Sequence, residues 1–551
     1  MKLLKKFCYP IKYNLYLDID LNKNEYYGIN NIELNIINPT NIIEFHASEF
    51  NITQIKLNNN IINNIKYDKE NQIYTIYLDN ILNKNIYNLE IYFNNNISNS
   101  DSFMKYINEF KNNRTIYYTR FEPISARKCY PCFDEPIYKI KYNLTIKIND
   151  STYDILFNTD PISIQKINND AIYKFIETIP MSTYVNSFII GKFNYIEKYS
   201  YDNIRIRIYF PKDETNIESA QFALDCSVKI TDFLIDYTQI KYPYNKIDFI
   251  GVDNLDAGGC ENYGLIYCNM DRLLFDIKTT SCNTKIEIAT VIVHELVHMW
   301  FGNLVSTKKW NDIWLKEGFA RYYENYIISI LYPELNIYSR FNYNLLSTLD
   351  LNSSINRTTI SKITNISYIK NIYDSLTYNK GAAILTIIVN YIGIENFRIK
   401  IIKYLNKYKF NNTSTSEFLD IILEDLNYNE QLIIKFLINK YLYTNGLPII
   451  NSNKNININI NHWILDFDLY KKYFNNKLIN DKINGYYIVI YDNIEFNLNK
   501  YSNNELLSIF YDLYFSTINK IIEPKNFINY TSNLLLHLKN KQIDFYLFKY
   551  I

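Results

Sequence analysis

Two histidines that flank a glutamate have the clearest chemical meaning in this chain. His294 and His298 are four residues apart, and Glu295 directly follows the first of them. On a helix, residues i and i+4 lie on one face, so both imidazoles can bind the same Zn²⁺. Glu295 would then face a metal-bound water and could act as its general base. Given the 5 histidines and 57 acidic residues, chance predicts roughly 0.005 such matches, so the spacing indicates a zinc site.

A catalytic zinc needs a third protein ligand, and Glu317 is the candidate. It follows His298 after eighteen residues, in the aromatic-rich, helix-like stretch 310–320. A single glutamate is usually a solvated surface charge. In such a stretch, however, an unpaired carboxylate would be costly to bury, and a metal would remove that cost. We therefore expect His294, His298 and Glu317 to hold one Zn²⁺ per chain.

These motifs resemble those of the zinc aminopeptidases of the aminopeptidase N family. That family has His-Glu-x-x-His, then eighteen residues and Glu, with Gly-x-Met-Glu-Asn upstream; here residues 258–262 read Gly-Gly-Cys-Glu-Asn. Three further stretches fit the same pattern, at residues 121–136, 378–382 and 485–491. The resemblance extends from the N-terminus to the region of residue 492.

The resemblance implies roles for residues that composition could not select. Glu295 would be the general base, and Tyr378, in Tyr-x-Lys-Gly-Ala, would donate to the oxyanion. Glu122 and Glu261 would hold the α-ammonium of a peptide, because an exopeptidase must measure from the end of its substrate. The other expected substrate contacts are Arg120, Cys260, Asn262, Tyr373 and two glycines that leave room for an extended peptide, Gly258 and Gly259.

Three substitutions depart from the family pattern. Cys260 replaces the usual Met, which would enlarge the pocket for the first side chain of the substrate. Arg120 replaces the usual Gln and would either pair with Glu122 or favour an acidic first residue. Lys316 replaces the common Asn beside Glu317, and the sequence predicts no effect for this change.

The C-terminal region is the fourth departure. The family usually ends in a helical domain of several hundred residues that caps the cleft, whereas only residues 494–551 follow the small β segment here. An open cleft, a cap from another chain and an incomplete sequence are the alternatives. We expect a natural short form, whose exposed apolar face would support self-association.

The elements that position these residues fall into four predicted domains. Period-two alternation at 13–19 and 204–210 predicts strands, and a 3.6-residue period at 287–301, 381–394 and 415–442 predicts helices. We predict a multidomain α+β fold: an N-terminal antiparallel β domain (1–197), a thermolysin-like, mainly helical catalytic domain (198–445), a small β domain (446–493) and a shortened helical C-terminal region (494–551).

Composition narrows the function classes. The 58 Lys+Arg and 57 Asp+Glu give a net charge of +1, which argues against a nucleic-acid partner. No apolar run reaches the length of about 18 residues that a membrane span needs. The 7 cysteines have no framework spacing and predict a reducing, cytoplasmic location. We expect Cys129 and Cys132 to be structural, and Glu324 is a candidate to orient a histidine ligand.

We therefore expect a zinc aminopeptidase that acts on peptides with a free N-terminus. Three alternatives stay open. An inactive scaffold of the same fold would lack a ligand, Glu295 or Tyr378, and all are present. A zinc endopeptidase would not need Glu122 and Glu261. The epoxide hydrolase branch of the family shares the zinc site, and the sequence does not exclude it.

Overall fold

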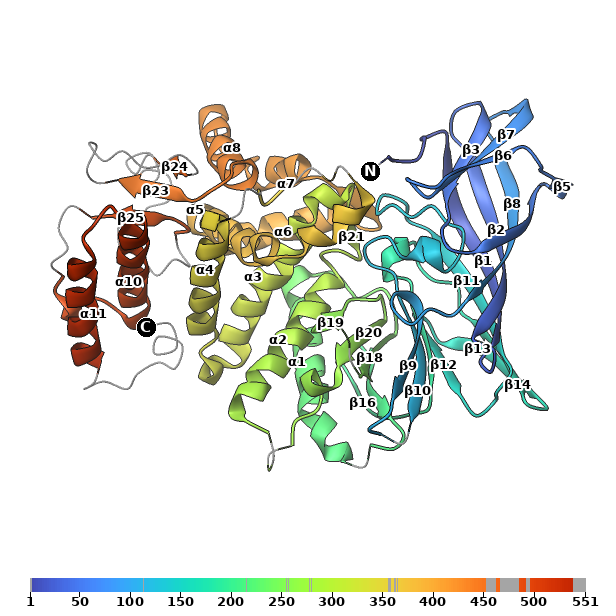
Figure 1. The fold of residues 1–551 in the computed structure, drawn as a ribbon, viewed down its shortest axis with the longest axis horizontal. Coiled ribbons are helices and arrows are strands. Elements are labelled where there is room, and N and C mark those ends of the chain that lie inside the picture. The colour runs from blue at the N-terminus through green and yellow to red at the C-terminus, as the bar shows by residue number, and fades with distance from the viewer. Residues whose placement is uncertain are drawn as a thin grey trace. The chain divides into compact units, whose positions relative to one another are not determined.

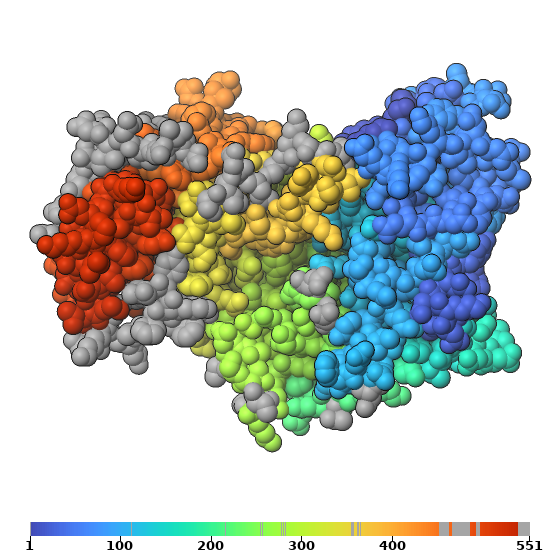
Figure 2. Space-filling view, viewed as in Figure 1, coloured from blue at the N-terminus to red at the C-terminus, as the bar shows by residue number. Residues whose placement is uncertain are grey.

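The computed structural model describes residues 2–538, except residues 112, 215, 254, 256, 277, 279, 355–357, 361–362, 364, 452–461, 466–484 and 492–495. The chain divides into two compact units. The first comprises Met1–Trp310, Ile363–Lys370 and Leu405–Thr413, and the second comprises Asn311–Lys362, Asn371–Tyr404 and Ser414–Ile551. Figure 1 labels the elements, and Figure 2 shows the same face with its side chains. The four predicted domain boundaries stay predictions.

The first unit begins with β-sheets, as the sequence predicts. The largest sheet has the order β13-β14-β11-β1-β2-β8-β4-β5, and its neighbours are antiparallel except β1 and β11. Strand β1 alternates buried and half-buried residues, which is the period-two pattern of a strand. The strands are β1 Cys8–Asp20, β2 Glu25–Ile36, β4 Asn51–Leu57, β5 Asn60–Ile61, β8 Ile86–Asn96, β11 Lys141–Ile148, β13 Pro161–Ile167 and β14 Asp170–Phe175.

Two smaller sheets accompany the large one. Their orders are β3-β7-β6 and β12-β15-β10-β9. The strands are β3 Thr40–His46, β6 Ile65–Asp68, β7 Ile73–Leu82, β9 Ser102–Asn108, β10 Arg114–Arg120, β12 Asp154–Phe157 and β15 Phe188–Gly191.

A five-stranded sheet and two helices complete the part of the first unit that carries the histidines. The sheet has the order β16-β17-β18-β20-β19. Every residue of β18 is buried, whereas the two-residue strand β19 forms the edge and pairs antiparallel with β20. The elements are β16 Phe193–Tyr199, β17 Arg205–Pro211, α1 Gln221–Thr238, β18 Lys246–Val252, β19 Gly259–Cys260, β20 Leu265–Asn269, α2 Cys282–His298, β21 Val305–Thr307 and β22 Asn411–Thr413.

Helices dominate the described residues between 314 and 443 and between 503 and 538, which agrees with the predicted mainly helical catalytic domain and helical C-terminal region. They are α3 Trp314–Leu331, α4 Ile337–Ser354, a π-helix at Leu376–Lys380, α5 Gly381–Ile392, α6 Ile394–Tyr408, α7 Thr415–Ile422, α8 Tyr428–Tyr443, α10 Asn503–Ile518 and α11 Pro524–Leu538. A Cβ placed on Gly318 in α3 would lie 3.1 Å from the backbone of Gly381 in α5. Glycine at both positions therefore lets these two helices approach closely.

The helical segment predicted at 415–442 is two helices in the structure. Helix α7 ends at Ile422, and α8 starts with a new capping box in which the Asn427 side chain accepts from Glu430 N. This reciprocal cap satisfies backbone donors that a continuous helix would pair internally. The apolar periodicity continued across the break and concealed it.

The predicted small β domain is described only in part. Its strands are β23 Pro448–Asn451, β24 Trp463–Ile464 and β25 Ile488–Ile490, in the order β24-β23-β25. Strand β25 lies in the segment 485–491 that the sequence singles out. The rest of this prediction, at 452–461, 466–484 and 492–495, lies outside the described residues, and so does 539–551 of the predicted C-terminal helical region.

No single helix within the described ranges is long and apolar enough to cross a membrane. A pair bent by 115°, Leu376–Ile392 with Ile394–Tyr408, passes the same length and composition test when taken together. The core helix of a globular fold passes this test as well, and most of α5 is buried.

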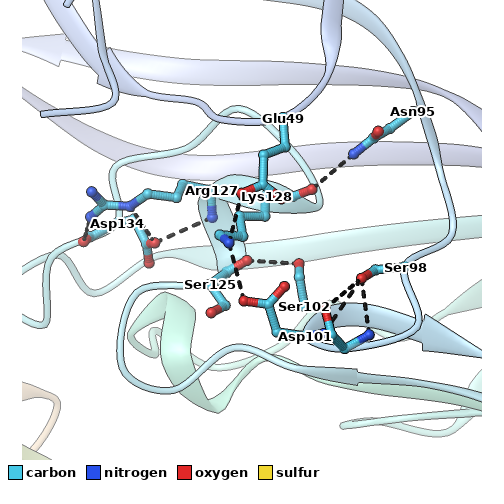
Figure 3. Close-up of polar contacts among 10 residues, drawn as sticks. Glu49, Asn95, Ser98, Asp101, Ser102, Ser125, Arg127, Lys128 and Asp134 are labelled. Atoms are coloured by element: carbon cyan, nitrogen blue, oxygen red, sulfur yellow. Dashed lines mark hydrogen bonds and ion pairs between the residues drawn. The ribbon is translucent and has the colours of Figure 1, made fainter. Parts of the chain in front are cut away.

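A buried ion pair fixes the segment 121–136. Arg127 and Asp134 have side chains that are 1% and 0% exposed, and Arg127 Nε donates to Asp134 Oδ2 at 2.9 Å. Arg127 N also donates to Asp134 Oδ2, and Thr183 Oγ1 donates to Oδ1 at 2.6 Å. Figure 3 shows this pair beside the more exposed contacts of Lys128 with Glu49 and Asp101. The Asp134 carboxylate thus has a partner for each oxygen, which a buried charge requires.

Replacing Asp134 with alanine should therefore destabilise the protein strongly. Asp134→Ala leaves the Arg127 guanidinium buried without its carboxylate, which should lower the free energy of unfolding by about 3–5 kcal/mol. Urea unfolding followed by circular dichroism measures this change. Asp225→Ala is the control, because it removes the exposed Lys198–Asp225 pair and should cost less than about 1 kcal/mol. Equal losses in the two variants would contradict the role given to Arg127–Asp134.

Candidate metal and substrate site

Helix α2 presents two imidazoles to the same point. His294 Nε2 and His298 Nε2 lie 3.2 Å apart, and the two rings are inclined at 83°. Two nitrogens bound to a tetrahedral zinc at about 2.05 Å would lie about 3.3 Å apart, so the observed separation fits a shared metal ion. The two imidazoles meet because residues four apart lie on the same face of a helix.

The surroundings of His298 suit a metal ligand. The residue is 1% exposed, and its Nδ1 lies 3.1 Å from the carbonyl oxygen of Phe301. A proton on Nδ1 would donate to this carbonyl, which leaves the lone pair of Nε2 directed at the metal position. A backbone acceptor on the far nitrogen is the usual way in which proteins orient such a ligand.

Glu295 lies directly against strand β19. A Cβ placed on Gly259 would lie 2.4 Å from Glu295 Oε1 and 2.7 Å from its Cγ, so the whole carboxylate arm occupies the space that a side chain would need. At Gly258 the nearest atom to such a Cβ is Val291 Cγ2, at 3.3 Å. Because Gly259 has no side chain, the buried carboxylate of Glu295 fits beside the backbone of the edge strand β19.

Two further carboxylates converge near the same strand. Oxygens of Glu122 and Glu261 lie within 4.8 Å of one another. The pKa of the neighbouring Cys260 thiol is raised to about 12, mainly by burial; Glu295, Glu261 and Glu122 also raise it, and Arg120 lowers it. The structure thus brings Arg120, Glu122, Cys260, Glu261 and Glu295 together, and the Cys260 thiol stays protonated at neutral pH.

Asn303 connects the end of helix α2 to this carboxylate cluster, and the sequence did not predict this connection. Its backbone N donates to His298 O at 3.0 Å, and its Nδ2 donates to Glu261 O at 2.7 Å. Lys139 Nζ donates to Asn303 O at 2.7 Å from the N-terminal β region. Asn303 follows His298 by five residues, so it lies next to the histidine motif, but nothing in the sequence indicated its partner.

Asn262, a predicted substrate contact, is nearly enclosed. It is 4% exposed, and its backbone N donates to Cys260 O at 2.9 Å. Its Nδ2 has no hydrogen-bond partner among the described residues. This donor lies in the sequence motif of Glu261 and is available to a bound group.

The second unit holds the other predicted site residues. Glu317 is 2% exposed in the first turn of α3, and its Oε1 lies 3.2 Å from Lys316 Nζ. Tyr378 lies in the π-helix that leads into α5, and Tyr373 precedes this π-helix by a few residues. The close contact of Gly318 with Gly381 holds α3 against α5. Lys316, whose effect the sequence left open, is thus an ion-pair partner of Glu317.

Glu324 accepts hydrogen bonds from an arginine one turn earlier on α3. Arg321 Nη1 donates to both of its carboxylate oxygens, at 2.5 and 2.8 Å. Its predicted support of a histidine stays a prediction, as do the functional roles of all the residues above.

Comparisons with known proteins match the N-terminal β region and the region that carries the histidines to the same family. Residues 222–441 match the model of the peptidase family M1 domain, and residues 9–185 match that of the peptidase M1 N-terminal domain. Endoplasmic reticulum aminopeptidase 1 of Rattus norvegicus is 30% identical over 75% of this chain and 46% of its own length. Aminopeptidase M1-C of Oryza sativa subsp. japonica is 28% identical over 81% and 51% of the two chains. The chain spans about half the length of these curated relatives.

The histidine geometry predicts metal binding that can be measured directly. Protein purified without chelators should contain about one Zn²⁺ per chain, and His298→Ala should lose it because one of two converging nitrogens is gone. Inductively coupled plasma mass spectrometry after dialysis measures the content. His537→Ala, on α11, is the control and should keep the metal. Full zinc retention by His298→Ala would remove His298 from the ligand set.

Proposed function

This chain belongs to peptidase family M1, and we propose on that basis that it is a zinc-dependent aminopeptidase that hydrolyses the N-terminal residue from peptides. Peptidases of this family depend on zinc in general. One observation carries the proposal: the convergent imidazoles of α2 lie in the same segment as Glu295, and Glu295 lies beside the edge strand β19 and the carboxylates of Glu122 and Glu261.

We infer that His294, His298 and Glu317 hold one Zn²⁺ per chain. The 3.2 Å separation of the two Nε2 atoms supports the histidines. The spacing of eighteen residues and the burial of Glu317 support the third ligand. When bound, zinc would supply a Lewis acid that activates water and polarises the scissile carbonyl.

Glu295 is the proposed general base. Its carboxylate accepts a proton from water and returns it to the leaving amine. Because it lies against the backbone at Gly259, a peptide that pairs with the edge strand β19 brings its scissile bond near this carboxylate. Tyr378 donates a hydrogen bond to the carbonyl oxygen as negative charge develops on it.

Glu122 and Glu261 are the proposed anchor for the free α-ammonium. Two carboxylates whose oxygens lie within 4.8 Å repel each other, and a cation between them relieves that repulsion. This pair favours an aminopeptidase over an endopeptidase, which has no use for it. Arg120 lies near both carboxylates, so it competes with the substrate amine or attracts an acidic first side chain.

Location and self-association are further proposals. The six cysteines whose side chains are described are buried and are not joined by disulfides, which supports a reducing compartment such as the cytoplasm. Ile528, Leu535 and Leu536 on α11 are exposed, which supports self-association through the C-terminal region.

Hydrolysis of aminoacyl fluorogenic amides and their N-acetylated forms tests the proposed function. We expect cleavage of the free amines only, with loss on chelation of the metal, because acetylation removes the cation that Glu122 and Glu261 bind. Glu295→Gln should keep the zinc and reduce turnover by about 10²–10⁴-fold. Equal cleavage of acetylated substrates would indicate an endopeptidase. Absence of cleavage by the zinc-loaded protein would favour the scaffold.

Gly259 offers a separate test of how the base is positioned. Gly259→Ala introduces a Cβ where Glu295 lies, so the carboxylate must move, and kcat should fall by about 10²-fold. Gly258→Ala is the matched control, since its Cβ meets only Val291 Cγ2 at 3.3 Å, and its loss should be much smaller. Thermal unfolding checks that both variants fold. A kcat in Gly259→Ala equal to that of the control would contradict this placement of Glu295.

A further inference from the structure

The backbone turn after helix α2 is held by side chains from the N-terminal region of the chain. Tyr184 Oη donates to Gly302 O at 2.7 Å, and Lys139 Nζ donates to Asn303 O at 2.7 Å. Lys139 Nζ also donates to Ser306 Oγ, in β21. Buried carbonyl groups normally have partners, and two successive carbonyls of this turn receive theirs from outside the helix. The N-terminal region therefore fixes the path of the turn.

Lys139 is an unusual residue for this task, because its ammonium is buried without a carboxylate. The residue is 6% exposed, and no acidic side chain pairs with it among the residues that the structure describes. Burial lowers the pKa of the ammonium to about 7. Enclosing a charge in this way destabilises the fold, whereas an apolar side chain of similar length would not. The donor of Lys139 therefore has a role beyond packing.

Asn303, the acceptor of that bond, joins two other backbones. Its N donates to His298 O at 3.0 Å, and its Nδ2 donates to Glu261 O at 2.7 Å. Asn303 itself is 1% exposed, so water does not compete for these bonds. One short side chain thus determines how far the backbone of a proposed zinc ligand lies from the backbone of a proposed anchor for the substrate amine.

This separation matters for an exopeptidase. The anchor holds the α-ammonium, the metal polarises a carbonyl, and the distance between the two selects the first peptide bond of the substrate. A displacement of about 1 Å between such groups can reduce turnover by about 10²-fold. A residue that touches neither substrate nor metal can therefore control the reaction through this distance.

We propose that Asn303, held in place by Lys139, is a positioning residue that sets the distance between the amine anchor at Glu261 and the metal position at His298. This inference rests on the proposed aminopeptidase function and adds two residues to it. Asn303 acts through the backbone of Glu261, and Lys139 acts through the carbonyl of Asn303.

Kinetics of Asn303→Leu and Lys139→Met test the proposal, with the aminoacyl fluorogenic amide that the unmodified protein cleaves fastest. In Asn303→Leu, kcat per bound zinc should fall by about tenfold and KM should change by less than about threefold, because the substrate still binds but its carbonyl is misaligned. Lys139→Met should change both constants in the same direction. Thermal unfolding checks that the variants fold.

A double-mutant cycle distinguishes positioning from general support of the fold. Because Asn303 acts through Glu261, adding Asn303→Leu to Glu261→Gln should cause no further loss of kcat/KM. Asn352→Leu is the matched control, since Asn352 is also buried and its Nδ2 donates to a backbone carbonyl, Gly446 O, at 2.8 Å. Any loss that it causes should multiply with that of Glu261→Gln. The same multiplication for Asn303→Leu would overturn the proposal.

Hydrogen exchange gives a readout that needs no substrate. The Asn262, Tyr263 and Leu265 amides all donate to backbone carbonyls. Their exchange, measured by mass spectrometry on residues 259–265, should be at least about tenfold faster in Asn303→Leu and Lys139→Met, and unchanged in Asn352→Leu. Unchanged exchange in both folded variants would overturn the proposal. Absence of cleavage by the unmodified protein would contradict the proposed function and the positioning role with it, while exchange would still decide whether Asn303 holds Glu261.

Discussion

The close approach of helix α2 to the edge strand β19 is the constraint on which the candidate site depends. Because residue 259 has no side chain, the carboxylate of Glu295 fits against the strand. The next turn of the same helix carries His298, whose imidazole is oriented by the Phe301 carbonyl. A single contact between a helix and a strand thus holds Glu295, the proposed base, near the proposed metal ligand His298 and beside the edge strand where a peptide backbone could pair.

Asn303 extends this arrangement from the helix to the carboxylate cluster. It binds the end of α2 through its backbone and Glu261 through its side chain, while Lys139 holds its carbonyl. The distance between the amine anchor and the metal determines which peptide bond an exopeptidase cleaves. A short, buried series of hydrogen bonds is well suited to keep that distance constant, because each unmade bond would leave a buried polar group without a partner.

Two ion pairs in the first unit show what an enclosed charge requires. Arg127 with Asp134 and Lys246 with Asp248 are almost fully enclosed ion pairs. An unpaired buried charge costs roughly several kcal/mol, so each member of such a pair needs the other.

The sequence by itself determined the type of fold and the convergence of His294 and His298 on one face of a helix. The spacing of His294 and His298 was sufficient to predict that their side chains lie together, because residues i and i+4 lie on the same face of a helix. The alternation of apolar and polar residues located β1 and β17, and the 3.6-residue apolar period located α2. Both patterns arise because one side of each element is buried. The same reasoning missed the break between α7 and α8, where the apolar pattern continues across a capping box.

Only the tertiary structure decided which residues from distant parts of the chain meet. The contact of Gly259 with Glu295, the bond from Asn303 to Glu261, and the pairing of Lys316 with Glu317 depend on packing and on side-chain direction. Local patterns record which side of an element is buried, but they do not record what it is buried against.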